Sequence, residues 1–246
     1  MTDRCWSSGV MAATTDLKSV VRKNVRVRVP PRLQSFQQPN LRNTIMPNWC
    51  SNELTVVGKY NKLKEFVLNG IDDDNGSWCL SKYRPMPEEL ATTTKPSKLS
   101  DEEKTELVNK YGYSDWYDWN MANLGCKWDC STDMSISEDD IRESTNSNSS
   151  ISLYFESPWG PPDEWMRFIT NEYPELEFVL DYEEPGMMFC GYIACSDGDF
   201  SQEEGEMEMG DDDGNPVTWS DELDCWVTED GEKVEDANPI NPFRYL

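Results

Sequence analysis

The chain of 246 residues holds 47 acidic and 22 basic residues and no histidine, so its net charge at neutral pH is −25. Lack of histidine excludes Ser–His and Cys–His nucleophile pairs, the commonest general base and the commonest neutral metal ligand. The charge argues against direct nucleic-acid binding, and a mean hydropathy of −0.73 with no long apolar run gives no candidate for a membrane span.

The first 45 residues differ in charge from everything after them. They hold eight basic and two acidic residues, whereas the rest of the chain holds 14 (22 − 8) and 45 (47 − 2), a balance of −31. Alternating Val and Arg from Val25 to Val29, followed by Pro30, give no amphipathic helical face. No apolar run precedes a small-residue cleavage site, so a secretory signal is excluded.

Reverse translation suggests an origin for this segment. Arg26–Pro30 can be encoded by codons containing GGTTCGAGTCC, the T-arm of a transfer RNA, and Thr15–Val20 can encode an anticodon stem and loop with the anticodon TAA. We hypothesise that residues 1–45 are read-through of a leucine tRNA gene and that translation begins at Met46, which leaves 201 residues (246 − 45). The alternative is a disordered basic tail, and both explanations place residues 1–45 outside the fold.

Three helices and one strand are predicted between Met46 and Gly125. Asn52–Gly58 alternates as a strand with Leu54 and Val56 on one face, and a helix from Tyr60 ends at Gly70. Prolines disfavour a helix over Tyr83–Leu90. Further expected elements are a helix capped by Ser100 and Glu103 that runs to Gly112, and a short helix over Ser114–Leu124.

The second half of the chain predicts mainly strands. Their expected ranges are Lys127–Ile136, Ile151–Phe155, Leu176–Tyr182 and Met188–Cys195, with a loop over Ser137–Ser150 and a helix from Pro161 to Tyr173. This order predicts an α+β fold, a ferredoxin-like split βαβ sandwich with helices on one face of an antiparallel sheet. We expect this domain to span residues 46–200.

An acidic appendage is expected over residues 201–246. Asp221–Val234 predicts a small hairpin around Asp230 and Gly231. Trp219 and Trp226 are expected to dock this hairpin on the domain. An EF-hand is rejected, because aligning Gly214 with its glycine puts Met209 and Ser220 at the first and last ligand positions.

The eight cysteines do not predict a metal site. The close pairs, Cys126 with Cys130 and Cys190 with Cys195, lack the spacing of a zinc knuckle, and no histidine can complete a mixed site. We expect reduced, mostly buried thiols, and no metal or cofactor.

Four ordered stretches resemble the YubB-like ferredoxin-fold family of plasmids and bacteriophages. They are MPNWCSNELTVVG from Met46, NLGCKWD from Asn123, SPWGPPDEW from Ser157 and YEEPGMMFCG from Tyr182. Leu124 and Cys126 depart from the family pattern. The resemblance covers Met46–Phe200 and implies the fold, a mobile-element origin and a bacterial cytoplasm, but no activity, because the family's activity is not established.

The polar and aromatic residues of these stretches form the candidate binding site, which consists of Asn48, Trp49, Asn52, Lys127, Trp128, Trp159 and Glu184. The competing interpretation is structural, because Asn commonly serves turns and Trp commonly packs in a core. No catalytic residue is assigned, since no spacing demands acid–base work from Lys127 and Glu184.

Three functions follow as hypotheses. The first is a non-enzymatic module that binds a protein through its acidic surface and appendage. The second is a small-ligand binder or enzyme that uses the Trp, Asn, Lys and Glu cluster. The third is a DNA mimic that inhibits a host defence or DNA-binding enzyme, because a charge of −31 can imitate that of phosphates.

Overall fold

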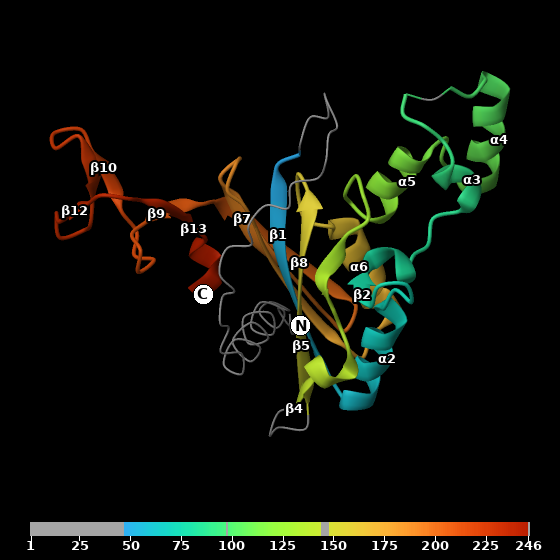
Figure 1. The fold of residues 1–246 in the computed structure, drawn as a ribbon, viewed down its shortest axis with the longest axis horizontal. Coiled ribbons are helices and arrows are strands. Elements are labelled where there is room, and N and C mark those ends of the chain that lie inside the picture. The colour runs from blue at the N-terminus through green and yellow to red at the C-terminus, as the bar shows by residue number, and fades with distance from the viewer. Residues whose placement is uncertain (1–46, 97, 144–147, 246) are drawn as a thin grey trace, which may run out of the picture. The chain divides into compact units, whose positions relative to one another are not determined.

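The main sheet is antiparallel, with the strand order β2-β3-β5-β1-β6-β7-β8 and with β4 paired to β5 outside this path (Figure 1). The computed structural model describes residues 47–96, 98–143 and 148–245, and the expectations for residues 1–45 lie outside this part of the chain. The strands of the main sheet are β1 (Trp49–Gly58), β2 (Ser77–Cys79), β3 (Ser131–Ser135), β4 (Arg142–Glu143), β5 (Ser149–Pro158), β6 (Glu177–Glu184), β7 (Phe189–Ser196) and β8 (Asp199–Glu206).

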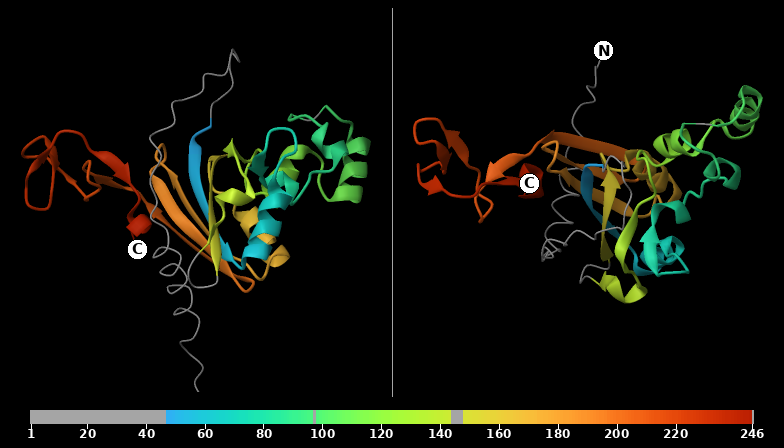
Figure 2. Two further views of the ribbon diagram at one scale, coloured as in Figure 1. Left: turned by 60° about the horizontal axis from the view of Figure 1, so that its bottom comes forward. Right: turned by 45° about the horizontal axis from the view of Figure 1, so that its top comes forward.

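Two helices connect the central strands. Helix α2 (Tyr60–Gly70) follows β1, and α6 (Asp163–Glu172) links β5 to β6. Both lie on the same face of the sheet (Figure 2), where Phe66 of α2 packs edge-on against Phe178 of β6. The partial order β3-β5-β1-β6 with these helices is the arrangement of a split βαβ unit, and the predicted α+β antiparallel architecture is confirmed.

Strand register decides which side chains are buried. Leu54 of β1 lies opposite Leu153 of β5 and Leu180 of β6, and all three are fully buried under the helices. Because side chains alternate along a strand, Glu53 and its neighbours at odd positions of β1 face the other side. The predicted common face of Leu54 and Val56 is therefore confirmed.

An aromatic cluster fills the space between helices and sheet. Tyr83 donates a 2.5 Å hydrogen bond to the Phe66 carbonyl and accepts one of 2.8 Å from the Trp78 indole. Trp165 of α6 packs at right angles to Trp78, and both indoles are fully buried. Truncating such a side chain costs about 3–5 kcal/mol, so this cluster fixes the helices on the sheet.

Short helices occupy the long connection between β2 and β3: η1 (Leu80–Lys82), α3 (Glu88–Ala91), α4 (Asp101–Tyr111) and α5 (Trp116–Asn123). The predicted capping box is present at α4, since Ser100 accepts from the Glu103 N–H and the Glu103 carboxylate accepts from the Ser100 N–H. Gly112 ends α4 with φ = 84°. Helix α3 differs from the expectation for Tyr83–Leu90, because it begins directly after Pro87, where a missing N–H is harmless.

Two predictions for the segment between α5 and β5 are confirmed only in part. The expected strand over Lys127–Ile136 is reduced to β3, because Lys127–Cys130 form a loop whose Trp128 carbonyl accepts from the Cys126 and Cys130 thiols. The expected loop over Ser137–Ser150 contains η2 (Glu138–Asp140) and β4, since Ser137 caps η2 through Asp140 and β4 pairs with β5.

The acidic part of the chain begins inside the main sheet. Strand β8 pairs with β7 along its full length to Glu206, beyond the boundary expected after residue 200. Two small sheets follow: β9 (Glu208–Gly210) with β13 (Asn238–Ile240), and β10 (Thr218–Ser220), β11 (Cys225–Val227) and β12 (Lys233–Val234) in that order. The predicted turn at Asp230 and Gly231 joins β11 to β12.

The tryptophans of the small sheet do not dock it on the domain as expected. Trp219 and Trp226 lie opposite each other on β10 and β11, with ring centroids 5.4 Å apart, and Trp219 is 48% exposed. The contacts to the main sheet come instead from the last turn, η3 (Pro242–Tyr245), where Phe243 meets the Tyr192 ring of β7.

Candidate functional site

Three tryptophans from distant parts of the sequence meet at one end of the sheet. Trp49 begins β1, opposite Pro158 at the end of β5, and Trp159 follows directly. Trp128 comes from the loop after α5. Trp128 has its ring centroid 6.2 Å from that of Trp49 and 5.9 Å from that of Trp159. We call these three residues the tryptophan platform.

The platform is open to solvent. Trp49 and Trp159 are each 43% exposed, in contrast to the fully buried Trp78 and Trp165 of the core. Indole rings expose this much apolar area at a cost, so a cluster of exposed indoles is characteristic of binding surfaces. The structural interpretation of Trp49 and Trp159 as core residues does not fit this exposure.

Lys127 lies over the platform. Its ammonium nitrogen is 4.4 Å from the Trp128 ring centroid and 5.0 Å from that of Trp159. Among the described residues no carboxylate lies within 4.0 Å of this ammonium group. The indole faces therefore already hold a cation through cation–π attraction, which is strongest for tryptophan.

The Trp159 backbone is strained. Its φ is 66°, in the left-handed region that a bulky side chain rarely adopts. The Trp159 N–H donates to the Asn48 carbonyl at 2.9 Å, and the Ser157 hydroxyl donates to the Gly160 carbonyl at 2.6 Å. These two bonds hold the turn after β5, and Asn48 contributes to the platform through its backbone.

Asn52 supports the strands below the platform. It lies inside β1 and not before it, and it is 4% exposed. Its amide donates to the Cys50 carbonyl at 2.8 Å, to the Ser157 hydroxyl at 2.8 Å and to the Phe155 carbonyl at 3.3 Å. Asn52 therefore links β1 to β5, which is a structural role.

The Glu184 carboxylate is used by the turn of the β6–β7 hairpin. The carboxylate is 2% exposed and accepts from the N–H groups of Gly186 at 2.8 Å and Met187 at 2.6 Å. A side chain at Gly186 would lie 3.1 Å from the Asn48 amide, so this turn packs beside the start of β1. The structure thus brings Trp49, Lys127, Trp128 and Trp159 together and assigns Asn52 and Glu184 to the framework.

A pair of buried thiols supports the loop that carries Lys127 and Trp128. The sulfurs of Cys126 and Cys130 are 3.6 Å apart, and both residues are 2% exposed. The neighbouring Cys126 thiol and burial raise the pKa of Cys130 well above its usual range. The only sequence signal for this role is that the two cysteines lie two positions before and two positions after Trp128.

The second close pair in the sequence, Cys190 and Cys195, does not come together in the structure. Cys190 and Cys195 are five positions apart on β7, so they face opposite sides of the sheet. Burial raises the pKa of Cys190 to about 11 and that of Cys195 to about 12. Within residues 47–96, 98–143 and 148–245, no group of three or more Cys, Asp or Glu side chains is arranged to hold a metal ion.

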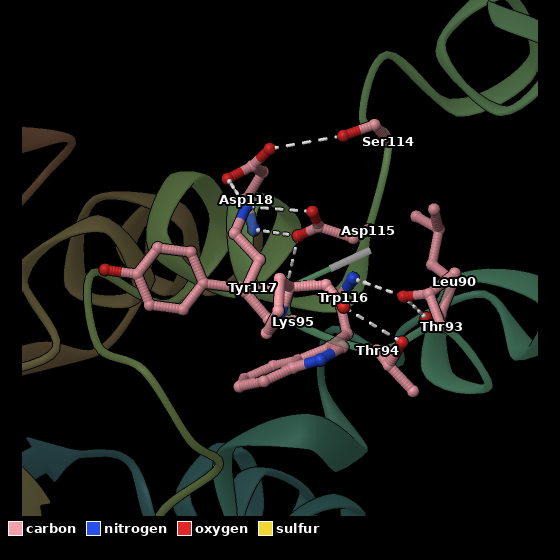
Figure 3. Close-up of polar contacts among 10 residues, drawn as sticks. Leu90, Thr93, Thr94, Lys95, Ser114, Asp115, Trp116, Tyr117 and Asp118 are labelled. Atoms are coloured by element: carbon pink, nitrogen blue, oxygen red, sulfur yellow. Dashed lines mark hydrogen bonds and ion pairs between the residues drawn. The ribbon is translucent and has the colours of Figure 1, made fainter. Parts of the chain in front are cut away.

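A second polar cluster joins the connection before α4 to α5 (Figure 3). The Lys95 ammonium contacts Asp115 at 2.8 Å and Asp118 at 3.0 Å, and Asp115 also accepts from the N–H groups of Tyr117 and Asp118. Burial alone would raise the pKa of Asp115, but Lys95 and these N–H groups outweigh it and lower the pKa. The Asp115 carboxylate caps the N-terminus of α5, so this cluster stabilises the fold.

No helix in the described part of the chain is both long and apolar enough to span a bilayer.

Two comparisons with known proteins returned a match. Residues 127–219 match the family model described as the ferredoxin-like domain in Api92-like protein. The solved structure of the protein api92 from Yersinia pseudotuberculosis matches with 14% identity, over 65% of this chain and 98% of that chain, at a TM-score of 0.33. No curated protein matches the chain.

Proposed function

We propose that the chain is a non-enzymatic protein-binding module whose partner docks on the tryptophan platform. The observation that carries this proposal is the exposed cluster itself, with Trp49 and Trp159 each 43% exposed beside Trp128. Tryptophan is the residue most enriched at the energetic centres of protein interfaces. Three adjacent indoles provide the large, rigid apolar contact that such centres use.

The strained turn supports the same proposal. A left-handed backbone at a bulky residue costs about 1–3 kcal/mol and is found mainly at functional positions. Trp159 has this conformation at φ = 66°, and the conformation directs an indole that is 43% exposed. A residue whose task was only to end β5 would serve better as glycine.

The second function, an enzyme or small-ligand binder, is less well supported. It needs Lys127 and Glu184 in one cleft, whereas the Glu184 carboxylate is buried and used by two N–H groups of the hairpin turn. The platform is an open surface and not a cavity, because its outer indoles are exposed. Such a surface favours a macromolecular partner.

DNA mimicry has one observation in its favour. The sheet face opposite α2 and α6 carries carboxylates on neighbouring strands, and register places Asp181 between Glu53 and Tyr192, with Glu203 beyond. Strand separations of about 4.8 Å and residue repeats of about 7 Å space these groups. On this alternative the partner would be a DNA-binding enzyme that meets the acidic face.

We propose in addition a family, a genetic origin and a cellular location for the chain. Membership of the YubB-like family, a phage or plasmid origin and a bacterial cytoplasmic location rest on the four sequence stretches from Met46, Asn123, Ser157 and Tyr182. The ferredoxin-like match over residues 127–219 is compatible with them.

Affinity capture from a bacterial host tests the proposed function. The wild-type chain is compared with a Trp49→Ala, Trp159→Ala double variant, and Trp219→Ala serves as control because it removes an equally exposed indole elsewhere. We expect a protein retained by wild type and control to be lost from the double variant. If all three chains retained this host protein equally, the platform would not be its binding site.

The same capture separates the alternative surfaces. Charge reversal of Asp211–Asp213 tests the acidic appendage. Glu156→Gln with Glu203→Gln tests the acidic sheet face, on which Glu156 of β5 lies opposite Ser51 of β1. DNA mimicry would be favoured over the platform if only the Glu156→Gln, Glu203→Gln variant lost the partner and if duplex DNA competed with the protein for that partner.

A further inference from the structure

We propose that the tryptophan platform is an arginine-binding site, held in the free protein by Lys127 and occupied in the complex by an arginine of a basic partner. This inference rests on the proposed function, because it names the chemistry of the partner at the same surface. It commits to a basic polypeptide segment as the occupant.

The geometry shows that the platform fits a cation. The Lys127 ammonium lies 4.4 Å from one indole centroid and 5.0 Å from another, within the range of about 6 Å for cation–π attraction. Trp49 lies beside Trp128 and is 43% exposed, so it can extend the aromatic surface for a longer side chain.

Lys127 is bound there weakly enough to be displaced. No described carboxylate pairs with its ammonium within 4.0 Å, and both flanking indoles have solvent-facing area. Lysine is a flexible, strongly hydrated cation, whereas the arginine guanidinium is planar, weakly hydrated and stacks on aromatic faces. A partner's arginine can therefore take the same position while Lys127 moves into solvent.

The charge of the protein selects a basic partner. A net charge of −25 attracts cationic surfaces and repels anionic ones at long range. An anionic ligand bound directly by Lys127 would have to approach against this field. Charge complementarity and the cation already seated on the indoles thus point to the same occupant.

The test uses the full chain and a nine-residue peptide of alternating arginine and glycine that carries an uncharged fluorophore. Its dissociation constant is measured by fluorescence anisotropy in 150 mM salt. Lys127→Ala removes the internal competitor, so we expect binding to tighten about 3-fold or more, as when a competent state becomes more populated. Lys127→Met is measured in parallel because its side chain retains the loop packing.

Lys59→Ala is the matched control. Lys59 is exposed, forms no ion pair with a described residue, and its removal changes the net charge by the same amount as removal of Lys127. We expect less than about a 1.5-fold change for this variant, since one distant charge is screened at this ionic strength. Trp128→Leu and Trp159→Ala should weaken binding about 3- to 30-fold.

The outcomes separate this inference from the proposed function. Weaker binding in Lys127→Ala, or a change equal to that of Lys59→Ala, overturns the arginine site, even if the tryptophan variants lose the captured host protein. Equal binding by the lysine version of the peptide and the arginine version would also overturn it. If the tryptophan variants retain the host protein, the proposed function itself fails.

Discussion

At the scale of single residues, Trp159 connects the fold to the proposed site. Its backbone conformation is unfavourable, and its indole lies on the surface, so its contribution to stability is small. Replacement by glycine removes the indole and relieves the left-handed strain at the same time. This replacement should therefore change the stability little while it weakens binding at the platform.

We expect the free energy of unfolding of Trp159→Gly to lie within about 1 kcal/mol of the wild-type value, because relief of strain offsets the lost contact with Trp128. Urea denaturation followed by fluorescence measures this. Trp165→Ala, which truncates a fully buried indole, should lose about 3–5 kcal/mol in the same experiment. A loss of more than about 2 kcal/mol in Trp159→Gly would make Trp159 a structural residue.

At the scale of elements, the junction between α5 and α6 positions the loop of Lys127 and Trp128. Gly125 ends α5 with φ = 83°, and a Cβ there would lie 2.9 Å from the backbone nitrogens of Asp163 and Glu164. Gly112 ends α4 with φ = 84°, but nothing lies within 4 Å of its Cβ position. The two glycines share a backbone conformation and differ in surroundings.

Alanine substitution at both positions measures this difference. Gly112→Ala should cost about 1 kcal/mol for the positive φ alone. Gly125→Ala should cost at least about 2 kcal/mol, because α6 must also move away from the new Cβ. Equal losses in urea denaturation would show that the α5–α6 contact contributes nothing to the position of the loop.

The Lys95 cluster predicts a pH dependence. The pKa of Asp115 is lowered in the folded state, so its ionisation stabilises the protein above the ordinary value of 3.8 and this stabilisation is lost as the pH falls through the depressed pKa. Asp115→Asn keeps a capping side chain and should cost about 1 kcal/mol at pH 7, since Lys95 is 40% exposed and screened. The difference from wild type should vanish well below pH 3.8; a constant difference would contradict the assignment.

Local signals predicted these elements better than they predicted the site. Ser100, Glu103 and Gly112 act through adjacent backbone groups, so their pattern defines α4 from sequence. The strand predicted over Lys127–Ile136 begins only at Ser131, because thiol bonds to the Trp128 carbonyl stabilise a loop before it. Trp219 and Trp226 were expected to dock on the domain, but their cross-strand pairing depends on a register that composition does not reveal.

At the scale of the whole molecule, the ferredoxin-like order follows from the sequence of strand and helix patterns, but the platform does not. Its members come from residues 49, 128 and 159, and only the pairing of β1 with β5 and the loop after α5 bring them together. Their placement in one candidate site was predicted, and a structural role for the Asn residues was the competing interpretation. The use of the Glu184 carboxylate by the turn of its own hairpin was not predicted.

The described residues from Asn48 onward form one compact unit. We therefore expect a chain beginning at Met46 to unfold cooperatively, with a melting temperature within about 3 °C of the full chain, a shift of less than about 1 kcal/mol. Circular dichroism on heating measures this for both chains. Loss of the transition in the shorter chain would show that residues 1–45 are part of the fold.

The most direct test of the platform is an NMR titration that observes the indole N–H groups of all ten tryptophans. The full chain, labelled with nitrogen-15 and assigned with single Trp variants, receives the alternating arginine–glycine peptide. We predict saturable shifts of the Trp49, Trp128 and Trp159 signals, with the core signals of Trp78 and Trp165 unchanged. Shifts confined to Trp219 and Trp226 would contradict the platform and place the binding surface on the small sheet.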